Sequence, residues 1–515
     1  MSESSPAAAK LAADVVVIGG GGSGLAAAIE AASLGRSVVL VEKAARLGGS
    51  TALSVGSITA TNTPQQLRQG ILDSPQAHFE DLQKFNQAVG LADNAKLSRL
   101  LVDNVPETVR WLMSMGVEFH GPMNELPHRK PRMHVVLPNS RAYIFHLGRR
   151  ARALGVDIRT SVRAAAFIVS GDRVTGIRCE GPDGPMEVHA RGGVVLCSGD
   201  YSASEDKRER YLGAHMKAVT PVNIQNTGDG QDMVEALGGN VVNRQLYLAG
   251  IRFQAPPAKW IHNLPPNRLL TRCMRLMLER LPGAIVRPFI MSFLTGILVP
   301  SPKLLQSGAM LVNRSGERFG DELDAPGPRI AQQPEQLAYL VFDAKLAAKF
   351  SGWPNYVSTA PGFAYASIAD YRRNRKDIFH EAATLEALAA RIGVPAAALA
   401  RTVAEYNASP ERERTGRMAA DRGPFVAIGP VRYLINFTDG GVAVSDELQV
   451  LGKGGQPVPG LYAAGFSGMG GVLLEGHGHH LGWAFTSGRL AGRRAAYNVV
   501  TADLPEAAGA QPASH

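Results

Sequence analysis

Cysteine is scarce in this chain. Its 515 residues include only Cys179, Cys197 and Cys273, an odd number without the spacing of a metal site. This scarcity excludes a disulfide framework and fits a reducing compartment. We therefore predict no metal centre. We also predict a cytoplasmic location, because the N-terminus lacks the basic and apolar segments of a signal peptide.

Aromatic residues are also few, at 6% of the chain. The net charge is +9, and much of the excess lies in residues 129–152 and 268–287. Neither segment is interleaved with the aromatic side chains on which a groove for single-stranded nucleic acid stacks bases. We therefore predict no nucleic-acid partner.

The segment 269–300 is basic and strongly apolar, but Arg287, Pro288 and Gly296 interrupt it. A membrane-spanning helix needs about 20 apolar residues without such interruptions, so this segment is not predicted to be one. Two alternatives remain for it. It lines a cavity or a dimer contact, or it makes a peripheral contact with a membrane surface.

Length and glycine are what the chain has in quantity. Single hydrophobic cores stop growing beyond about 250–300 residues, so the chain length predicts two domains. The 56 glycines suit an α/β enzyme with turns that approach phosphates closely. The clearest of these turns lies between Asp14 and Ser50.

That stretch predicts a βαβ unit. The apolar run 15–18 suits a strand buried on both faces, and Gly19, Gly21 and Gly24 follow with the spacing GxGxxG before an Ala-rich helix. The glycines allow a tight turn, close approach to a pyrophosphate and close packing of helix on strand. A second strand ends at Glu42, where this fingerprint places a carboxylate that binds ribose. The order predicts an ADP-containing dinucleotide without a 2′-phosphate.

The segments that follow distinguish FAD from NAD. Residues 47–56 (LGGSTALSVG) resemble the second phosphate and flavin contact of FAD-dependent oxidoreductases in the fumarate reductase and succinate dehydrogenase flavoprotein superfamily. Residues 198–200, 227–230 and 459–465 resemble further cofactor turns of that superfamily. The resemblance implies FAD held without a covalent bond, since residues 49–51 offer no His. The cofactor-binding residues that motif and resemblance imply are Gly19, Gly21, Gly22, Ser23, Gly24, Glu42, Lys43, Gly48, Gly49, Ser50, Thr51, Ser54, Val55, Gly56, Ser198, Gly199, Asp229, Gly465, His479, His480 and Leu481.

The resemblance covers most of the chain. Residues 310–319 resemble the LVNxxGERF segment of fumarate-reductase-like flavoproteins, and residues 382–407 resemble helices that follow it. The implied fold is α/β, a Rossmann-like FAD-binding domain with an inserted α+β cap domain. We place the FAD-binding domain at residues 1–240 and 425–515, and the cap at 241–424.

The substrate-binding positions of fumarate reductases are not kept. The Arg that donates a proton in those enzymes falls at about Pro326, and the Arg of their GANRLGGN stretch falls at Gly476. A dicarboxylate in a closed cavity needs such cations, so fumarate is disfavoured. Residues 474–488 resemble 3-ketosteroid dehydrogenases more closely, and Gly478 matches the Gly whose N–H polarises a substrate carbonyl there.

The two tyrosines of ketosteroid dehydrogenases are absent from the matching positions, so other groups must move the proton. Candidates are Glu475, His477 and Tyr247, because His and a buried Glu both titrate near neutral pH. His479 and His480 either contact the flavin or act on the substrate.

The sequence thus predicts an FAD-dependent oxidoreductase. It would move a hydride between flavin N5 and a carbon alpha or beta to the carbonyl of a largely apolar, ketosteroid-like or enone substrate, in desaturation or ene-reduction. One alternative is a reductase of unsaturated carboxylic acids with Arg252 or Arg329 as clamp. Another is a flavin-binding scaffold without a redox substrate. The sequence specifies neither the direction nor the external electron acceptor or donor.

Overall fold

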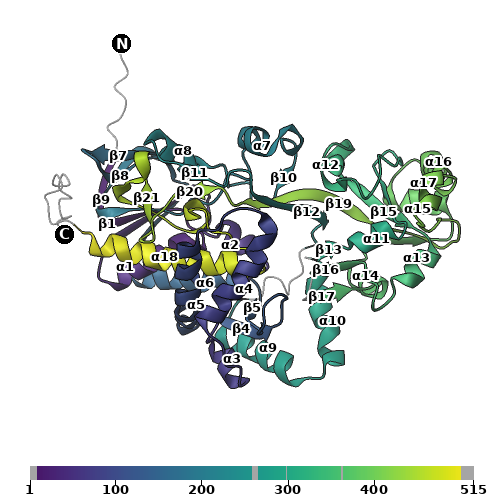
Figure 1. Cartoon of the computed structure of the whole chain (residues 1–515), viewed down its shortest axis with the longest axis horizontal. Helices are drawn as coiled ribbons and strands as arrows, with labels where there is room; N and C mark the ends of the chain where they lie inside the picture. Colours follow the sequence, from purple (N-terminus) through teal and green to yellow (C-terminus); the bar gives the residue numbers. More distant parts are fainter. Residues whose placement is uncertain (1–8, 258–264, 297, 361–363, 500–515) are drawn as a thin grey trace, which may run out of the picture.

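The computed structural model describes residues 9–257, 265–296, 298–360 and 364–499. Figure 1 shows two parts connected by long strands. One part contains both ends of the described chain, and the other is formed by its middle. The fold is α/β with an inserted second part, which confirms the predicted class.

The first sheet grows from the predicted βαβ unit. β1 (Ala9–Ile18) and β2 (Val38–Glu42) pair in parallel, and Val15, Val16 and Val17 are fully buried, as β-branched residues in a sheet covered on both faces should be. The strand order is β21-β22-β9-β1-β2-β6, and the β7–β8 hairpin attaches to β9. The remaining strands are β6 (Asp157–Thr160), β7 (Arg163–Ser170), β8 (Arg173–Gly181), β9 (Gly184–Leu196), β21 (Gln449–Leu451) and β22 (Pro457–Ala463).

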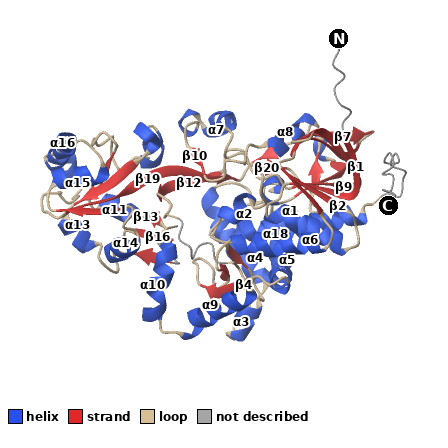
Figure 2. Ribbon diagram, turned by 180° about the vertical axis from the view of Figure 1, so that it is seen from behind, coloured by secondary structure: helices blue, strands red, loops and turns tan. Residues whose placement is uncertain are grey.

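Two helices far apart in the sequence lie side by side against this sheet. α1 (Gly22–Ser33) follows the glycine turn, and α18 (His479–Tyr497) is the last described helix (Figure 2). They approach closely because α18 carries glycines at the contact. A Cβ on Gly488 would lie 2.3 Å from the Ser23 carbonyl oxygen, and one on Gly492 would lie 2.2 Å from that of Ala27. The contact places the start of α18 near the glycine turn.

A helical layer and a small sheet complete this part. Residues 64–114 form three α-helices and a short 3-10 turn. These are α3 (Pro64–Arg68), α4 (Pro75–Asn86), η1 (Gln87–Val89) and α5 (Ala95–Ser114). The small sheet has the order β3-β5-β4. Its strands and the other elements of this part are α2 (Gly49–Leu53), β3 (Ser57–Thr59), β4 (Glu118–Met123), β5 (Met133–Leu137), α6 (Arg141–Ala153), α7 (Glu205–Leu212), η2 (Ala214–Met216), α8 (Asp229–Ala236), β11 (Val241–Val242), β20 (Gly441–Val442), η5 (Lys453–Gly455) and η6 (Gly465–Gly468).

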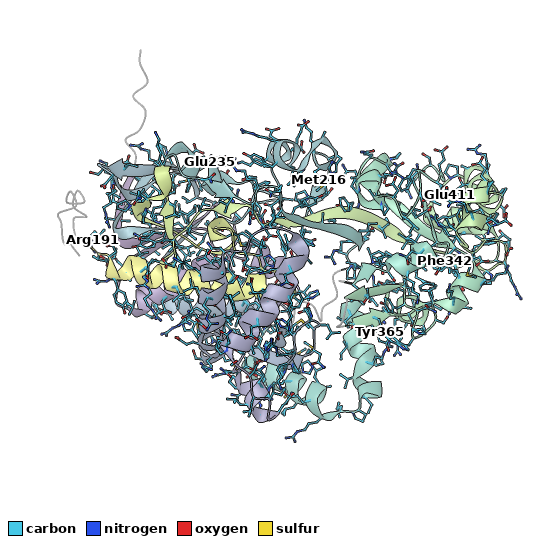
Figure 3. The ribbon with its side chains drawn as sticks, viewed as in Figure 1. Arg191, Met216, Glu235, Phe342, Tyr365 and Glu411 are labelled. Atoms are coloured by element: carbon cyan, nitrogen blue, oxygen red, sulfur yellow. The ribbon has the colours of Figure 1, made fainter. Side chains whose placement is uncertain are left out.

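The cap is built on a second sheet. Its main path is β10-β19-β15-β14, and β12 and β18 also pair with β19. Phe342 on β15 is buried in the interior of the cap, whereas Glu411 lies at the surface of the cap (Figure 3). The cap strands are β10 (Thr220–Pro221), β12 (Tyr247–Phe253), β13 (Val299–Pro300), β14 (Met310–Val312), β15 (Ala338–Phe342), β16 (Ser358–Ala360), β17 (Ala364–Ala366), β18 (Phe379–Ala382) and β19 (Phe425–Thr438). The helices are α9 (Arg268–Arg280), α10 (Gly283–Leu294), α11 (Pro302–Gln306), α12 (Pro326–Ala331), η4 (Pro334–Gln336), α13 (Ala344–Lys349), α14 (Ile368–Asn374), α15 (Leu385–Ile392), α16 (Ala396–Asn407) and α17 (Pro410–Arg414).

β19 bears on the predicted domain boundary at residue 425. This strand pairs with β12, β15 and β18, so residues 425–438 lie in the sheet of the cap. A boundary at residue 425 would separate β19 from the strands it pairs with. We therefore propose that the FAD-binding domain resumes after Thr438.

Candidate functional site

The glycine turn has the shape that the fingerprint requires. Gly19 adopts a φ of +105°, and a Cβ there would lie 2.3 Å from the Cys197 carbonyl oxygen. A Cβ on Gly24 would lie 1.8 Å from the Gly19 carbonyl oxygen. Around Gly21, by contrast, the nearest atom would be 3.9 Å away. The backbone is therefore packed at the first and third glycines and open at the second, at the N-terminus of α1, where a pyrophosphate binds.

Glu42 lies over this turn. Its Oε2 accepts from Gly20 N at 2.6 Å and its Oε1 from Ala44 N at 2.7 Å. A carboxylate has about four acceptor sites, so lone pairs remain for ribose hydroxyls. The structure thus brings Glu42 to the position that the motif predicts.

Lys43 and Asp229, both predicted to bind the cofactor, contact each other. Lys43 Nζ lies 2.9 Å from Asp229 Oδ2 and 2.6 Å from Thr227 Oγ1. Arg163 lies 3.4 Å from the other Asp229 oxygen, and both residues line a cavity of about 220 Å³ between β7 and α8. This cavity lies next to Lys43, the first residue after β2.

The second glycine turn closes onto the first. Gly48 and Gly49 have φ values of +152° and +51°, and Gly22 N donates to Thr51 Oγ1 at 3.1 Å. Ser50 Oγ accepts from Asn223 Nδ2 and Asn226 Nδ2, each at 3.0 Å.

Sequence reasoning missed these two asparagines. It placed Asp200 in a cofactor turn but did not predict its bond with Asn226, from which Asp200 accepts at 2.8 Å; burial raises the pKa of Asp200 to about 7. The signal was available. Asn226 directly precedes the Thr227–Gly230 turn that the sequence analysis singled out, and Asn223 lies three residues before Asn226.

Several of the other residues predicted to bind the cofactor contact one another or the two glycine turns. Ser198 Oγ lies 3.2 Å from Ser467 Oγ, which also donates to the Gly199 carbonyl oxygen. Gly465, with a φ of +62°, would clash with Ser23 if it carried a Cβ. Farther along the second turn, Ser54 Oγ donates to the Thr51 carbonyl oxygen, Gly56 accepts from the Tyr143 hydroxyl, Val55 is exposed, and Leu481 lies half-buried in the first turn of α18.

The segment before α18 holds the predicted catalytic residues. Gly478 caps α18 with a φ of +87°, and a Cβ there would lie 2.6 Å from Thr59 N. His477 is half-exposed and bound by buried Glu125, which lies 2.5 Å from its Nδ1 and also accepts from its backbone N–H. Thr59 Oγ1 donates to the His477 carbonyl oxygen at 2.6 Å. These contacts hold His477 and Gly478 against β3 and against the loop before β5.

Glu475 is solvent-accessible and differs from an ordinary surface carboxylate. Surrounding protein atoms desolvate it and raise its pKa; the Asp439 carboxylate raises that pKa further, and His480 lowers it. His480 Nε2 bonds Asp439 Oδ1 at 2.9 Å. These three polar groups therefore form one electrostatic unit at the start of α18.

Aromatic rings adjoin this unit. The rings of Phe437 and His480 are 4.5 Å apart, those of Phe437 and Phe466 are 5.0 Å apart, and those of Phe466 and His480 are 5.4 Å apart. We call Phe437, Phe466 and His480 the aromatic wall. His479 lies elsewhere, because its side chain is buried and turns toward His78 and His128. Burial lowers the pKa of His479 to about 4.

Tyr247 is not brought to this unit. It pairs with Thr438 in the β12–β19 register, while Leu248 pairs with Phe437. Neighbouring residues of a strand point to opposite faces, so Tyr247 lies across the sheet from Phe437. There it packs with a cluster that includes Leu212, Met216 and Tyr433.

The two predicted clamp arginines lie in different surroundings. Arg329 forms an ion pair with Asp324, and its α12 begins at Pro326. Arg252 on β12 shares the face of Leu248, and hence that of Phe437, by strand alternation. Burial lowers its pKa.

Comparisons with known proteins agree with a nucleotide-binding site at the two glycine turns. The family model described as "FAD binding domain" matches residues 14–272 and 277–473. The probable fumarate reductase Ifc3 of Shewanella frigidimarina (strain NCIMB 400) is 26% identical over 498 residues, which cover 93% of this chain and 74% of that protein.

Two solved structures share the fold. The open conformation of a flavocytochrome c3 fumarate reductase has a TM-score of 0.71 at 26% identity and covers 95% of this chain and 79% of that one. The 3-ketosteroid-Δ4-(5α)-dehydrogenase from Rhodococcus jostii RHA1 has a TM-score of 0.58 at 23% identity and covers 96% of this chain and 99% of that one.

The open backbone at Gly21, the carboxylate of Glu42 and the closure of the second turn all fit FAD, which when bound supplies two-electron hydride chemistry. In the part of the chain that the structure describes, no helix is long and apolar enough to cross a membrane. The chain belongs to the FAD-binding-domain family within the fumarate reductase and succinate dehydrogenase flavoprotein superfamily. It is an FAD-dependent oxidoreductase of the class that acts on CH–CH groups, and it acts on the C=C bonds of unsaturated substrates.

Proposed function

We propose that the substrate is a largely apolar ketone or enone, desaturated or reduced at the carbons alpha and beta to its carbonyl. The observation that carries the proposal is the aromatic wall beside Glu475. Two Phe rings offer apolar contact area, which suits a ring system such as a steroid or cyclic enone and gives a dicarboxylate no partner.

Each residue of the site has a separate task in this proposal. Phe437 and Phe466 hold the apolar body of the substrate and exclude water. Gly478 N, at the N-terminus of α18, is the donor for the substrate carbonyl, and the dipole of α18 favours negative charge there. Glu475 removes or returns the proton on the carbon alpha to the carbonyl, a task for which a raised pKa suits a carboxylate.

A second candidate function rests on Arg252. This guanidinium lies on the same face of the β12–β19 pair as Phe437 and could bind a carboxylate, so a reductase of unsaturated acids remains the competing proposal. Arg329, the other predicted clamp, forms an ion pair with Asp324.

A binding screen separates the two functions. Neutral cyclic enones and 3-ketosteroids are expected to perturb the flavin absorption spectrum at lower concentration than fumarate or succinate. Phe437→Ala should weaken ketone binding by about 10-fold or more, because covering a Phe side chain contributes roughly 1.5–3 kcal/mol. Phe145→Ala is the matched control, on a half-exposed ring of α6. Tighter binding of dicarboxylates, lost in Arg252→Ala, would favour the competing proposal.

The surface of α9 and α10 supports a further proposal, peripheral contact with an anionic membrane. α9 packs on β4 through one face, which buries Thr271 and Met274. Its other face exposes apolar side chains, and the exposed arginines of this helix lie among them. The exposed apolar residues of the two helices and their connection are Leu269, Leu276, Met277, Leu281 and Ile285, and the exposed arginines of α9 are Arg268, Arg272 and Arg280. Such a basic amphipathic surface fits anionic headgroups over an apolar interior.

Sedimentation with lipid vesicles tests this contact. The protein is expected to bind vesicles that contain phosphatidylglycerol, less so in high salt, and to bind neutral phosphatidylcholine vesicles weakly. Exchanging both Leu276 and Met277 for Glu should abolish the binding. Leu72→Glu, on a strongly exposed leucine elsewhere, should leave it intact. Equal binding by both variants, or self-association through this surface, would contradict the proposal.

A further inference from the structure

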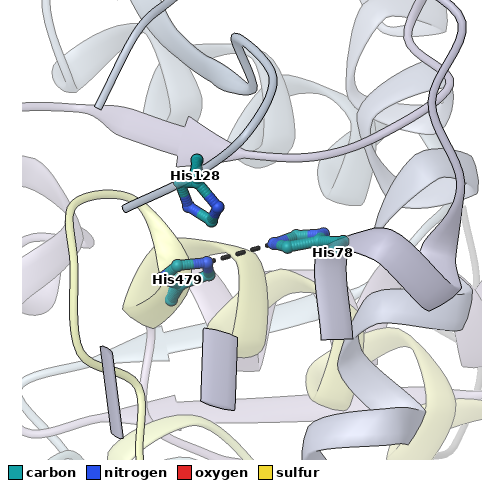
Figure 4. A group of neighbouring side chains, drawn as sticks. All are labelled: His78, His128 and His479. Carbon is teal, nitrogen blue, oxygen red and sulfur yellow. Dashed lines mark hydrogen bonds between the residues drawn. The ribbon is translucent and has the colours of Figure 1, made fainter. Parts of the chain in front are cut away.

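Three buried histidines from distant parts of the chain meet beside the start of α18. His78 lies on α4, His128 in the loop before β5, and His479 in the first turn of α18. His78 Nε2 and His479 Nε2 are 3.1 Å apart, and one ring nitrogen of each of the three residues lies within 4.8 Å of those of the others. Figure 4 shows the three rings around a common space, with a dashed line between His78 and His479.

The hydrogen bonds around the rings leave nitrogens for a ligand. His479 Nδ1 donates to the Glu475 carbonyl oxygen at 2.6 Å, so its Nε2 presents a lone pair toward His78. Metal-binding histidines usually donate their second N–H to such a carbonyl. His128 Nε2 is buried without a hydrogen-bond partner among the described residues. Buried polar atoms are rarely left in that state, so an absent ligand is a physical explanation for this nitrogen.

We propose that His78, His128 and His479 bind a divalent transition-metal ion, with Zn²⁺ as the best fit. Three imidazoles with one open position are a recurring zinc ligand set. Two nitrogens that each lie about 2.0–2.1 Å from a tetrahedral ion are a little more than 3 Å apart, close to the separation between His78 and His479. Imidazole ligands also exclude Mg²⁺ and Ca²⁺, which prefer oxygen.

The nearest cation, Arg132, does not prevent ion binding. It donates to His128 Nδ1 at 2.9 Å, but it makes three further hydrogen bonds to the fully buried carboxylates of Asp73 and Asp81. These carboxylates offset the charge of Arg132, and Asp81 also pairs with Lys84 and Arg129. When His128 binds through Nε2, the proton on that nitrogen moves to Nδ1, and Arg132 gives up one hydrogen bond while it keeps its carboxylate pairs. In His78 the proton likewise moves from Nε2 to Nδ1, so the number of protons is unchanged.

An ion at this position would tie three segments together. It would join α4 and the loop before β5 to the first turn of α18, directly after Glu475. The ion thereby stabilises the folded protein and fixes the segment that carries the predicted proton-transfer group. Ion binding by this cluster does not depend on which substrate the enzyme uses.

Metal analysis of the full chain with FAD bound tests the proposal. After equilibration with Zn²⁺ and removal of free ion, about one zinc per chain is expected by mass spectrometry. Co²⁺ in its place should give the intense visible bands of a tetrahedral site, beyond the flavin absorption. His78→Ala and His128→Ala should each lower metal affinity at least about 10-fold and abolish the rise in melting temperature that Zn²⁺ produces.

The control separates ligation from general damage. His146→Ala removes a buried histidine of α6 outside the cluster and should keep the zinc. His78→Gln and near-ultraviolet circular dichroism check that loss of metal is not loss of folding. Loss of zinc with FAD and circular dichroism unchanged supports the site. Wild-type protein that binds no stoichiometric zinc, or the same zinc content in His78→Ala, His128→Ala and wild type, overturns it.

Discussion

Replacing Glu475 with Gln is expected to slow flavin reduction by a saturating ketone about 10²–10⁴-fold while FAD stays bound. Gln keeps the shape of Glu but cannot accept a proton. The position suits proton transfer because the side chain is open to solvent, beside the aromatic wall, with a pKa that desolvation and Asp439 raise. Stopped-flow measurement at matched FAD occupancy gives the rate.

The pH dependence offers an independent readout of the same group. In desaturation Glu475 must be ionised to accept the proton, so the wild-type rate should fall as the pH drops through its raised pKa. Below that value the carboxyl is protonated and cannot act as a base. The Gln variant should lack this acidic limb, since the group that titrates is gone.

Two comparisons make the prediction specific. Glu411→Gln changes an exposed carboxylate of the cap and should leave the rate unchanged. His477→Ala should cost less than Glu475→Gln, because Glu125 binds His477 through both its ring and its backbone N–H. An unchanged rate in Glu475→Gln together with a large loss in His477→Ala would reassign the proton transfer to His477.

The first glycine turn of the cofactor site was predictable because the residues that indicate it lie close together in the sequence. The β-branched run 15–18, the glycine spacing and Glu42 fall within one short stretch, and each has a fixed geometric meaning. A Cβ at Gly19 or Gly24 would overlap backbone atoms, so no other residue fits those positions. Sequence reasoning therefore places the turn, the second strand and the carboxylate without knowledge of the remaining fold.

The histidine cluster and the aromatic wall could not be predicted in this way. His78 and His479 are 401 residues apart in the sequence, and neither stands in a recognisable metal-binding spacing. Phe437 meets His480 only because β19 of the cap ends beside the start of α18. Contacts of this kind depend on how separate elements pack, which residue spacing does not encode. The same reason explains Tyr247, whose position on the other face of the β12–β19 pair follows from strand register.

Replacing Gly24 with Ala is expected to abolish FAD retention. The added Cβ would lie 1.8 Å from the Gly19 carbonyl oxygen and 3.0 Å from its carbonyl carbon, far inside van der Waals contact. Both atoms belong to backbone that cannot rotate away, so α1 must shift from β1 and the Gly-rich turn must open. The shift removes the N–H groups at the start of α1 from the position where they face a pyrophosphate.

The flavin-to-protein absorbance ratio after gel filtration measures this loss. FAD affinity should fall more than about 10-fold. The charged hydrogen bonds to the pyrophosphate together contribute several times the roughly 1.4 kcal/mol that corresponds to a tenfold change in affinity. Gly352→Ala is the matched control, at a glycine of the cap where a Cβ would meet no atom within 4 Å. A Gly24→Ala protein that unfolds entirely would leave the cause open, so Glu42→Gln serves as the second variant. It keeps the turn but weakens both the bond from Gly20 N and the ribose contact, and it should lower FAD affinity with the fold intact. Full FAD retention in both variants would show that the dinucleotide does not bind at this turn.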